Sequence, residues 1–277
     1  MKLKLGTRYK RNDGLPFSFG EPYGEFVGRT AQGWPRFDLP GRKTCAVNGT
    51  DDGFSQVFGH VVVLSGGMDS TVALYNAVDK LGKENVRAIT FNYGSKHNAK
   101  EYRCASNTCE ELGVLHQRID LPFVDALFKS DLLISGGGIP DGHYADENMK
   151  STVVPFRNGI MLSIACGLAE SWAFDCVVIG NHEGDHAIYP DCTTGFIDSM
   201  GLAMRDGTYK QIELISPFNR IRKEDIAVIG DRLGVNWNET YSCYKGDVEH
   251  CGTCGTCTER KEAFEIAGIE DPTTYKN

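Results

Sequence analysis

The sequence predicts an α/β fold in which helices cover both faces of a parallel β-sheet. A small four-cysteine region is expected at the C-terminal end and an irregular extension at the N-terminal end. Apolar runs typical of buried strands alternate with helical segments from about residue 60 onward. A Gly-Gly turn joins the first of these strands to the first helix, and four cysteines are clustered between residues 243 and 257. We therefore expect three parts: residues 1–56, 57–240 and 241–277.

Strands and helices are expected in alternating order within residues 57–240. Short apolar runs predict strands at 61–64, 87–93, 117–121, 176–180 and 212–215. The segments between them predict helices at 70–81, 96–112, 158–171, 196–204 and 222–233. A loop is expected over residues 130–152, where glycines are frequent. Ligands of such sheets bind beyond the carboxyl ends of the strands, so residues 65–70, 93–97 and 180–185 should meet at one edge.

The bulk composition excludes several classes of protein. The chain has 277 residues, of which 41% are hydrophobic and 24% charged, as in soluble globular proteins. Its net charge of −8 argues against nucleic acid as a partner. No apolar run is long enough to span a bilayer, and the first residues lack the apolar part of a signal peptide. We expect a cytoplasmic protein with no membrane partner.

Residues 1–56 differ from the rest in charge and in pattern. They contain nine Lys and Arg against six Asp and Glu, a net charge of +3, which leaves −11 for the remainder. No period of 2 or 3.6 is sustained, so we expect an irregular segment. Its aromatic residues are expected to pack on the main domain, a second subunit or a partner protein: Phe17, Phe19, Tyr23, Phe26, Trp34 and Phe37. The alternative is a basic, aromatic arm that binds nucleic acid.

The sequence Ser65-Gly66-Gly67-Met68-Asp69-Ser70 predicts an anion site. It follows the expected strand that ends at Leu64 and precedes the first expected helix. Glycines allow close backbone approach, and the unpaired N–H groups and dipole of a helix N-terminus favour a negatively charged ligand. An ordinary capped turn is the alternative. No Gly-Lys-Ser/Thr follows, so this is not a Walker-type loop, and no dinucleotide fingerprint is present.

The four clustered cysteines predict a metal site. Cys243, Cys251, Cys254 and Cys257 are separated by seven, two and two residues, which lets four thiolates surround one ion. Such a set is typical of a closed structural zinc site, which should hold the C-terminal segment onto the sheet. Free thiols and an iron–sulfur cluster are the alternatives. A zinc-ribbon nucleic-acid module would not account for the acidic charge or the anion loop.

Two resemblances to known families follow from these residues. The loop 65–70 is similar to the pyrophosphate loop of the N-type ATP pyrophosphatases, which split ATP between its α and β phosphates and adenylate a substrate. Together with the cysteines, five more segments resemble the 7-cyano-7-deazaguanine synthase family: 91–97, 140–144, 153–158, 184–192 and 242–246. The resemblance runs from about residue 59 to the end. It implies a Rossmann-like fold of the adenine nucleotide α-hydrolase type.

The resemblance also implies a reaction. It predicts a ligase of queuosine biosynthesis that converts 7-carboxy-7-deazaguanine and ammonia to 7-cyano-7-deazaguanine through an adenylated acid and an amide. ATP, Mg²⁺ and Zn²⁺ are the expected cofactors, and a homodimer is the expected assembly. Adenylation gives a carboxylate the leaving group that it lacks, so the site needs donors and a cation around the departing pyrophosphate.

Site residues are assigned from the loop, the edge of the sheet and the resemblance. Pyrophosphate contacts are expected from Ser65, Gly66, Gly67, Asp69 and Ser70, with Asp69 also a candidate Mg²⁺ ligand. Further nucleotide contacts are expected from Leu64, Met68, Tyr93, His97 and Gly180. Catalytic roles are expected for Ser65, Asp69, Ser70, Lys96, Arg157 and Lys223. Substrate contacts are expected from Arg157, Asn158, Asp185, Tyr189 and Asp191. Surface positions for Lys96, Arg157 and Lys223, and turn capping for the two aspartates, are the alternatives.

Other activities are compatible with the same residues. A related enzyme could adenylate a deazaguanine acid and stop at the amide, or form a nucleobase–protein conjugate. A different pyrophosphate-loop enzyme, such as a tRNA thiolase or an NAD synthetase, is a further alternative. A binding module without activity is the least consistent with an intact loop.

Overall fold

The computed structural model describes residues 59–143 and 146–276 together with five strands nearer the N-terminus. The chain divides into two compact units, Met1–Phe58 and Gly59–Asn277. The larger unit contains the anion loop, the expected sheet and the four clustered cysteines. It therefore holds every residue that the sequence assigns to a site.

A five-stranded parallel sheet forms the centre of the larger unit. Its strands are β6 (His60–Val63), β7 (Val86–Asn92), β8 (Leu115–Asp120), β9 (Cys176–Val178) and β10 (Glu213–Ile215). They lie in the order β10-β9-β6-β7-β8, and each neighbouring pair is parallel. The predicted parallel sheet is thus confirmed, with β6 in the middle, so the loop that follows β6 lies at the centre of the ligand-binding edge.

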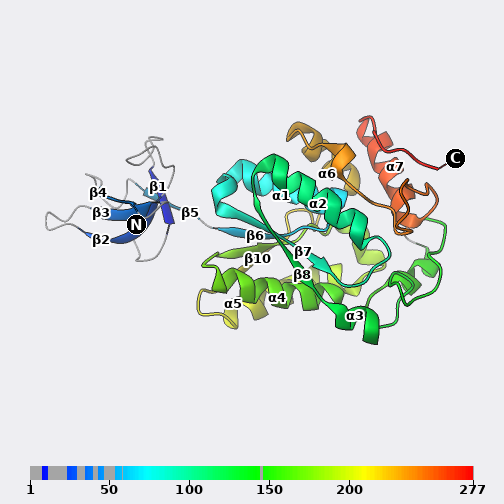
Figure 1. The fold of residues 1–277 in the computed structure, drawn as a ribbon, viewed down its shortest axis with the longest axis horizontal. Helices are drawn as coiled ribbons and strands as arrows, with labels where there is room; N and C mark the ends of the chain where they lie inside the picture. The colour runs from blue at the N-terminus through cyan, green and yellow to red at the C-terminus, as the bar shows by residue number, and fades with distance from the viewer. Residues whose placement is uncertain are drawn as a thin grey trace. The chain divides into compact units, whose positions relative to one another are not determined.

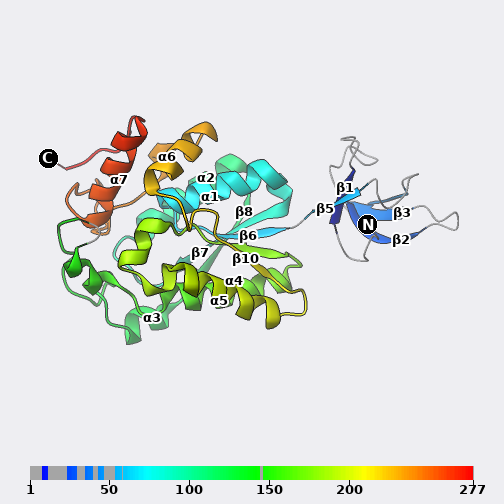
Figure 2. The ribbon, with the colours of Figure 1, turned by 180° about the vertical axis from the view of Figure 1, so that it is seen from behind.

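Helices cover both faces of this sheet (Figures 1 and 2). One face packs against α1 (Met68–Leu81), α2 (Asn98–Leu112), α6 (Lys223–Arg232) and α7 (Gly255–Ala267). The other face packs against α4 (Arg157–Ser171) and α5 (Thr194–Asp206), with α3 (Pro122–Leu127) contributing at the β8 side. Short 3₁₀ helices complete the described part: Lys83–Asn85, Glu147–Thr152, Glu183–Ala187, Pro190–Cys192 and Trp237–Glu239.

Alternating side chains of the strands build two hydrophobic cores. In β6, Val61 packs toward α4 and α5, whereas its neighbour Val62 packs toward α1 and α6. Val177 and Val178 of β9 divide in the same way. Both faces are buried, which explains why these strands are continuous apolar runs without polar alternation. None of the described helices combines the length and apolar character that crossing a bilayer requires.

Two helices were not predicted from the sequence. Helix α3 is only six residues long and begins at Pro122, a residue suited to a first helical turn. Helix α7 begins at Gly255, between two of the clustered cysteines, and its Phe264 is buried in the core beside Trp237. A metal-binding pattern and a helix start overlap there, so the spacing of the cysteines masks the helical spacing of the residues that follow.

The N-terminal unit corrects the expectation of an irregular segment. Strands β1 (Arg8–Arg11), β2 (Gly24–Arg29), β3 (Pro35–Leu39), β4 (Lys43–Ala46) and β5 (Phe54–Val57) form an antiparallel sheet in the order β4-β3-β2-β1-β5. Strands of four to six residues show too few alternations to be recognised from sequence. Phe37 is buried against Tyr9, with ring centroids 6.4 Å apart. The side chains of the other expected aromatic contacts lie outside the described residues: Phe17, Phe19, Tyr23, Phe26 and Trp34.

Candidate active site

The loop between β6 and α1 is shaped by two serine hydroxyls. The Ser65 N–H donates to Ser70 Oγ at 3.1 Å, and the two Oγ atoms are 2.9 Å apart. Ser65 Oγ also accepts from the Gly67 N–H at 3.1 Å. Helix α1 begins directly afterwards at Met68, so the N–H groups of residues 68–70 have no acceptor within the helix. The loop thus lies at a helix N-terminus as the sequence predicts, an arrangement that favours a negatively charged ligand, and anion binding itself stays a prediction.

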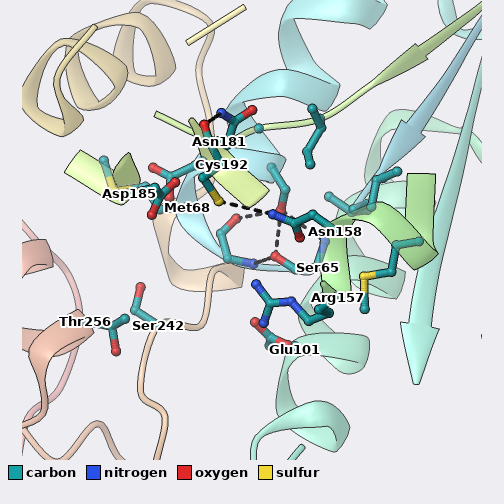
Figure 3. A pocket seen from close by; sticks show the side chains of 18 of the residues that line it. Ser65, Met68, Glu101, Arg157, Asn158, Asn181, Asp185, Cys192, Ser242 and Thr256 are labelled. Atoms are coloured by element: carbon teal, nitrogen blue, oxygen red, sulfur yellow. Dashed lines mark hydrogen bonds between the residues drawn. The ribbon is translucent and has the colours of Figure 1, made fainter. Parts of the chain in front are cut away.

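One pocket at the carboxyl ends of the strands collects most of the predicted residues (Figure 3). Its lining comes from the loop after β6, the ends of β7 and β9, and the starts of α2, α4 and α6. The predicted residues among the lining are Leu64, Ser65, Gly67, Met68, Asp69, Ser70, Tyr93, His97, Arg157, Asn158, Gly180, Asp185, Tyr189 and Lys223. Segments separated by more than 150 residues in the sequence therefore contribute to one site.

Three predicted residues do not line this pocket. Gly66 has φ +92°, and a side chain there would place its first carbon 2.1 Å from the backbone oxygen of Glu101. Lys96 is turned away, because its Nζ donates to the backbone oxygens of Asp131, at 2.6 Å, and of Leu133. Asp191 lies behind the pocket, where its Oδ2 accepts from the Asn158 N–H at 2.8 Å. These positions do not support the direct phosphate contact that was expected of Lys96. They do not support the base contact that was expected of Asp191 either.

Lys223 is a cation of the pocket lining that contacts the anion loop through Asp69. Its Nζ is 3.1 Å from Asp69 Oδ2 and 2.8 Å from Glu259 Oε2. Burial by itself would lower the pKa of Lys223, but the two carboxylates raise it above its ordinary value, so the ammonium stays charged. Asp69 Oδ1 is buried and makes no hydrogen bond within the described residues. That oxygen is available to a further cation.

The start of α4 directs a second cation into the pocket. Arg157 is its first residue, and Arg157 Nη1 donates to the Tyr93 hydroxyl at 3.1 Å. Phe156, just before it, has a left-handed backbone with φ +53°, which is unusual for a residue other than glycine. The Asp191 carboxylate caps the following turn at Asn158. Asp191 thus supports the segment from which Arg157 and Asn158 reach the pocket.

The far wall of the pocket is built from turns after β9. Asp185 Oδ2 accepts from the His182 N–H at 3.0 Å, and His182 Nδ1 accepts from the Gly184 N–H at 3.0 Å. These bonds fix the short helix Glu183–Ala187, so Asp185 both caps a turn and lines the pocket. Tyr189 lies within 3.2 Å of the Tyr244 hydroxyl, which joins this wall to the C-terminal region.

Several lining residues were missed in the sequence. They are Glu101, Asn181, Tyr241, Ser242, Tyr244 and Thr256. Glu101 Oε2 is 3.3 Å from His97 Nε2, one helical turn earlier. The spacing of four residues between a predicted site histidine and a glutamate on the same helix was the available signal. Ser242 and Tyr244 belong to the segment 242–246 that carries the family resemblance, but that resemblance did not place them in the pocket, which they reach only through the fold of the cysteine segment.

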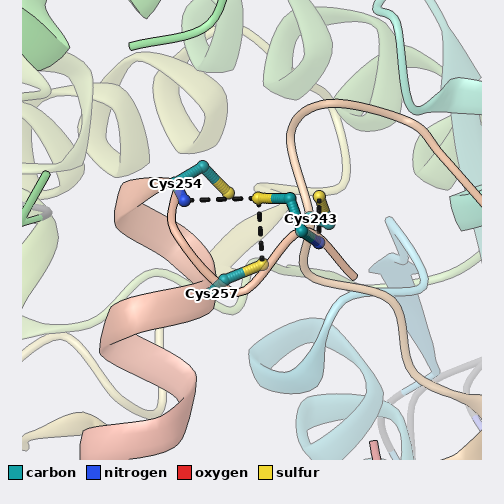
Figure 4. A group of neighbouring side chains, drawn as sticks. Cys243, Cys254 and Cys257 are labelled. Atoms are coloured by element: carbon teal, nitrogen blue, oxygen red, sulfur yellow. Dashed lines mark hydrogen bonds between the residues drawn. The ribbon is translucent and has the colours of Figure 1, made fainter. Parts of the chain in front are cut away.

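The four clustered cysteines form one compact group, and Figure 4 labels three of them, Cys243, Cys254 and Cys257. The sulfur atoms of Cys243, Cys251, Cys254 and Cys257 all lie within 4.8 Å of one another. Sγ of Cys251 is 3.9 Å from Sγ of Cys257. Tetrahedral zinc with bonds of about 2.3 Å to sulfur requires sulfur atoms about 3.8 Å apart. The donor set and its spacing fit such an ion.

This cysteine group adjoins the pocket. The Tyr241 N–H donates to the Gly66 oxygen at 2.9 Å, so the segment leading to Cys243 is tied to the anion loop. Tyr241, Ser242 and Tyr244, on either side of Cys243, line the pocket. A metal bound by the cysteines would therefore hold one wall of the site as well as the C-terminal segment.

Comparisons with known proteins identify a family for residues 59–268. The family model described as "Queuosine biosynthesis protein QueC" matches residues 59–268. A Porphyromonas gingivalis protein named 7-cyano-7-deazaguanine synthase is 54% identical over 216 residues, covering 78% of this chain and 96% of that protein. A Desulfotalea psychrophila protein of the same name is 50% identical over 215 residues, covering 78% and 97%. Among solved structures, NMN synthetase from Francisella tularensis has a TM-score of 0.44 at 17% identity, covering 77% of this chain and 79% of that chain. The family match begins at residue 59 and leaves out the N-terminal unit.

Proposed function

Because the chain belongs to the family of the queuosine biosynthesis protein QueC, we propose that it converts 7-carboxy-7-deazaguanine and ammonia to 7-cyano-7-deazaguanine with ATP. The observation that carries this proposal is the 54% identity to a 7-cyano-7-deazaguanine synthase over 96% of that enzyme's length. The family match and these relatives do not favour the amide-forming, conjugate-forming, thiolase or NAD synthetase alternatives. The protein is thus an enzyme of the ligase type.

The pyrophosphate loop supports the adenylation step. The substrate carboxylate attacks the α-phosphorus of ATP, and pyrophosphate leaves with the electron pair of the broken bond. The N–H groups of residues 68–70 and the hydroxyls of Ser65 and Ser70 would bind the departing pyrophosphate, and the Lys223 ammonium would offset its charge. These donors are fixed before ATP arrives, so little reorganisation accompanies the reaction.

The carboxylate of Asp69 fits a magnesium ion. One of its oxygens is held by Lys223, and the other is buried without a hydrogen bond in the described part of the chain. Magnesium bound by one carboxylate and by the phosphates of ATP is a common arrangement. When bound, the ion supplies charge neutralisation for the leaving pyrophosphate, and Asp69 keeps it at the loop.

Substrate recognition is assigned to the residues around α4 and the turns after β9. The Arg157 guanidinium suits the carboxylate of the acid, and its bond to Tyr93 fixes its direction. The carboxylate of Asp185 suits the N–H groups of a guanine-like ring, with Asn158 and Tyr189 as further contacts. Asp191 holds Asn158 in place rather than touching the base.

The remaining parts of the chain are assigned supporting roles. We propose that residues 57–240 form the ATP pyrophosphatase domain and that residues 241–277 form a zinc-binding region that closes it. The nine cysteines whose side chains are described are all free, consistent with a reducing compartment such as the cytoplasm. A homodimer, and contact of the N-terminal unit with a second subunit or a partner protein, are parts of the same proposal. Light scattering of the purified chain would measure the assembly.

The test is a product analysis by mass spectrometry. The purified chain is incubated with 7-carboxy-7-deazaguanine, ammonium, ATP and magnesium. Nitrile, AMP and pyrophosphate are the expected products, and the Asp69→Ala variant should form none of them. Asp79→Ala, at an exposed position of the same helix, is the matched control and should keep full activity. Amide as the end product would favour the amide-forming alternative, and absence of AMP in the wild type would contradict the proposal.

A further inference from the structure

Glu101 is a buried acid in the pocket that the adenylation step does not use. Its side chain is 14% exposed and lines the same pocket as the anion loop and Arg157 (Figure 3). Its backbone oxygen lies against Gly66, so the carboxyl group projects from a point fixed relative to the loop. Burying a carboxyl group without a role there would be costly.

The groups around Glu101 leave its carboxyl group able to exchange a proton. His97 Nε2, at 3.3 Å, is its nearest partner. Arg157 of α4 and Tyr93 after β7 face it from the other elements, and Cys104 lies one turn further along α2. Among the described residues, no Lys or Arg nitrogen lies within 4.0 Å of its oxygens, and the His97 ring beside it is neutral. Glu101 is therefore not neutralised by a salt bridge.

The proposed reaction requires a base after each adenylation. Ammonia bonded to the acyl carbon must lose a proton before AMP can leave a neutral amide. The amide nitrogen must lose two protons before the carbon–nitrogen triple bond is complete. We infer that Glu101 is the base that takes protons from the substrate nitrogen in both steps, an assignment that rests on the proposed function.

Each of the two steps forms a bond to carbon or phosphorus, releases a leaving group and transfers protons from the substrate nitrogen. In amide formation, the carbon–nitrogen bond forms, one N–H proton moves to Glu101, and AMP leaves with the electron pair of the carbon–oxygen bond. In nitrile formation, the amide oxygen attacks the α-phosphorus of ATP and pyrophosphate leaves. One N–H proton passes to water, the second passes to Glu101, and AMP again leaves with the carbon–oxygen pair. Glu101 then releases each proton to solvent.

The other groups that line the pocket are less suited to this role. Asp69 is 3.1 Å from the Lys223 ammonium, and Asp185 accepts from the backbone at His182. Burial lowers the pKa of His97 to about 3, and Arg157 acts in the same direction, so its ring stays neutral and is a weak base. Burial raises the pKa of Cys192 and of Tyr244. The His97 ring lies beside the carboxyl group of Glu101, with 3.3 Å between His97 Nε2 and Glu101 Oε2.

Burial also matches the proton affinity of Glu101 to the task. It raises the pKa of Glu101 to about 8, an effect that Arg157 partly opposes. A base of that strength binds a proton firmly and still returns it near neutral pH. The ionised form is the active one, so the nitrogen steps should become faster as the pH rises toward 8 and then level off.

The experiment separates the nitrogen steps from adenylation. Conversion of the amide to the nitrile is followed from pH 6 to 10, which avoids the titration of ammonia itself. Adenylation is followed as exchange of labelled pyrophosphate into ATP with the acid and no ammonium. Glu101→Gln should slow nitrile formation by about a hundredfold or more and remove the rise toward pH 8, while exchange stays within about twofold of wild type. Glu101→Asp should recover part of the rate of nitrile formation, and that rate should still rise with pH.

A control variant and three contrary outcomes test the assignment of Glu101. Glu110→Gln, at an exposed position of α2, should match wild type in both assays. The inference is overturned if Glu101→Gln converts the amide at the wild-type rate, if it keeps the pH-dependent limb, or if exchange falls as far as nitrile formation. Absence of exchange in the wild-type enzyme would instead count against the proposed function.

Discussion

Gly66 in the anion loop is packed directly against the backbone of Glu101 in α2. A side chain at residue 66 would place its first carbon 2.1 Å from the Glu101 carbonyl oxygen, and the backbone of Gly66 has φ +92°. The anion loop and the helix that carries the buried acid are therefore fixed to each other by contact between main chains. Such a contact tolerates no side chain, because neither backbone can move without displacing a strand or a helix.

Substitution of Gly66 by alanine should damage both stability and nucleotide binding. The left-handed backbone and the collision together should cost at least about 1–3 kcal/mol of unfolding free energy. Urea unfolding and ATP titration measure the two effects. Gly167→Ala is the control, because residue 167 lies within α4 with open space around it and alanine is the better helix former there. Equal unfolding midpoints for Gly66→Ala and wild type would contradict the close contact.

Removal of the Lys223 charge should leave two buried carboxylates unbalanced. Lys223 is 11% exposed and contacts both Asp69 and Glu259, so Lys223→Met should lower the unfolding free energy by about 3–5 kcal/mol. The double variant Lys223→Met, Glu259→Gln should recover part of this loss without recovering activity. Chemical denaturation measures the unfolding free energy, and the AMP assay measures the activity. Lys80→Met, at an exposed position of α1, should change neither.

Loss of the cysteine-bound metal should lower activity as well as stability. Cys254→Ser removes one of four sulfur ligands, and the segment around Cys243 carries Tyr241, Ser242 and Tyr244 into the pocket. Elemental analysis should give less than one zinc ion per chain, and nitrile formation should fall together with the metal content. Cys166→Ala, within α4 and outside the cysteine group, should keep its zinc. A zinc-free Cys254→Ser variant with full activity would refute the link between metal and pocket.

His60 should make the fold sensitive to acid. Burial lowers the pKa of His60 from 6.5 to about 4, with Asp175 partly opposing the effect. Above pH 6.5 the ring is neutral in both states, so it contributes no pH dependence. Below pH 6.5 the unfolded chain binds a proton that the folded chain excludes, and stability falls until about pH 4, by up to about 3 kcal/mol.

The His60→Asn variant tests this assignment. Its unfolding free energy should fall less than that of the wild type between pH 7 and pH 4, because one of the groups that binds a proton on unfolding has been removed. Other buried histidines, such as His97, keep part of the acid sensitivity in both proteins. Parallel curves for His60→Asn and wild type would disprove the assignment.

The sequence by itself determined the features whose signals are local. The valines on both faces of β6 and β9 specify strands within a few residues. The Gly-Gly turn before α1 and the spacing of the cysteines indicate, as locally, a candidate anion loop and a candidate metal site. The parallel sheet follows from the order of such elements, and the edge that carries the site follows from the sheet.

Only the tertiary structure decided which side chains share the pocket. Lys96 and His97 are neighbours in the sequence, yet the first donates to the loop carbonyls of Asp131 and Leu133, while the second lines the pocket beside Glu101. Ser242 and Thr256 lie near the anion loop because the cysteine segment folds back toward β6. The five N-terminal strands likewise depend on pairing between segments too short to show a period. Contacts of this kind arise from hydrogen bonds and packing between residues far apart in the chain, and no local pattern encodes them.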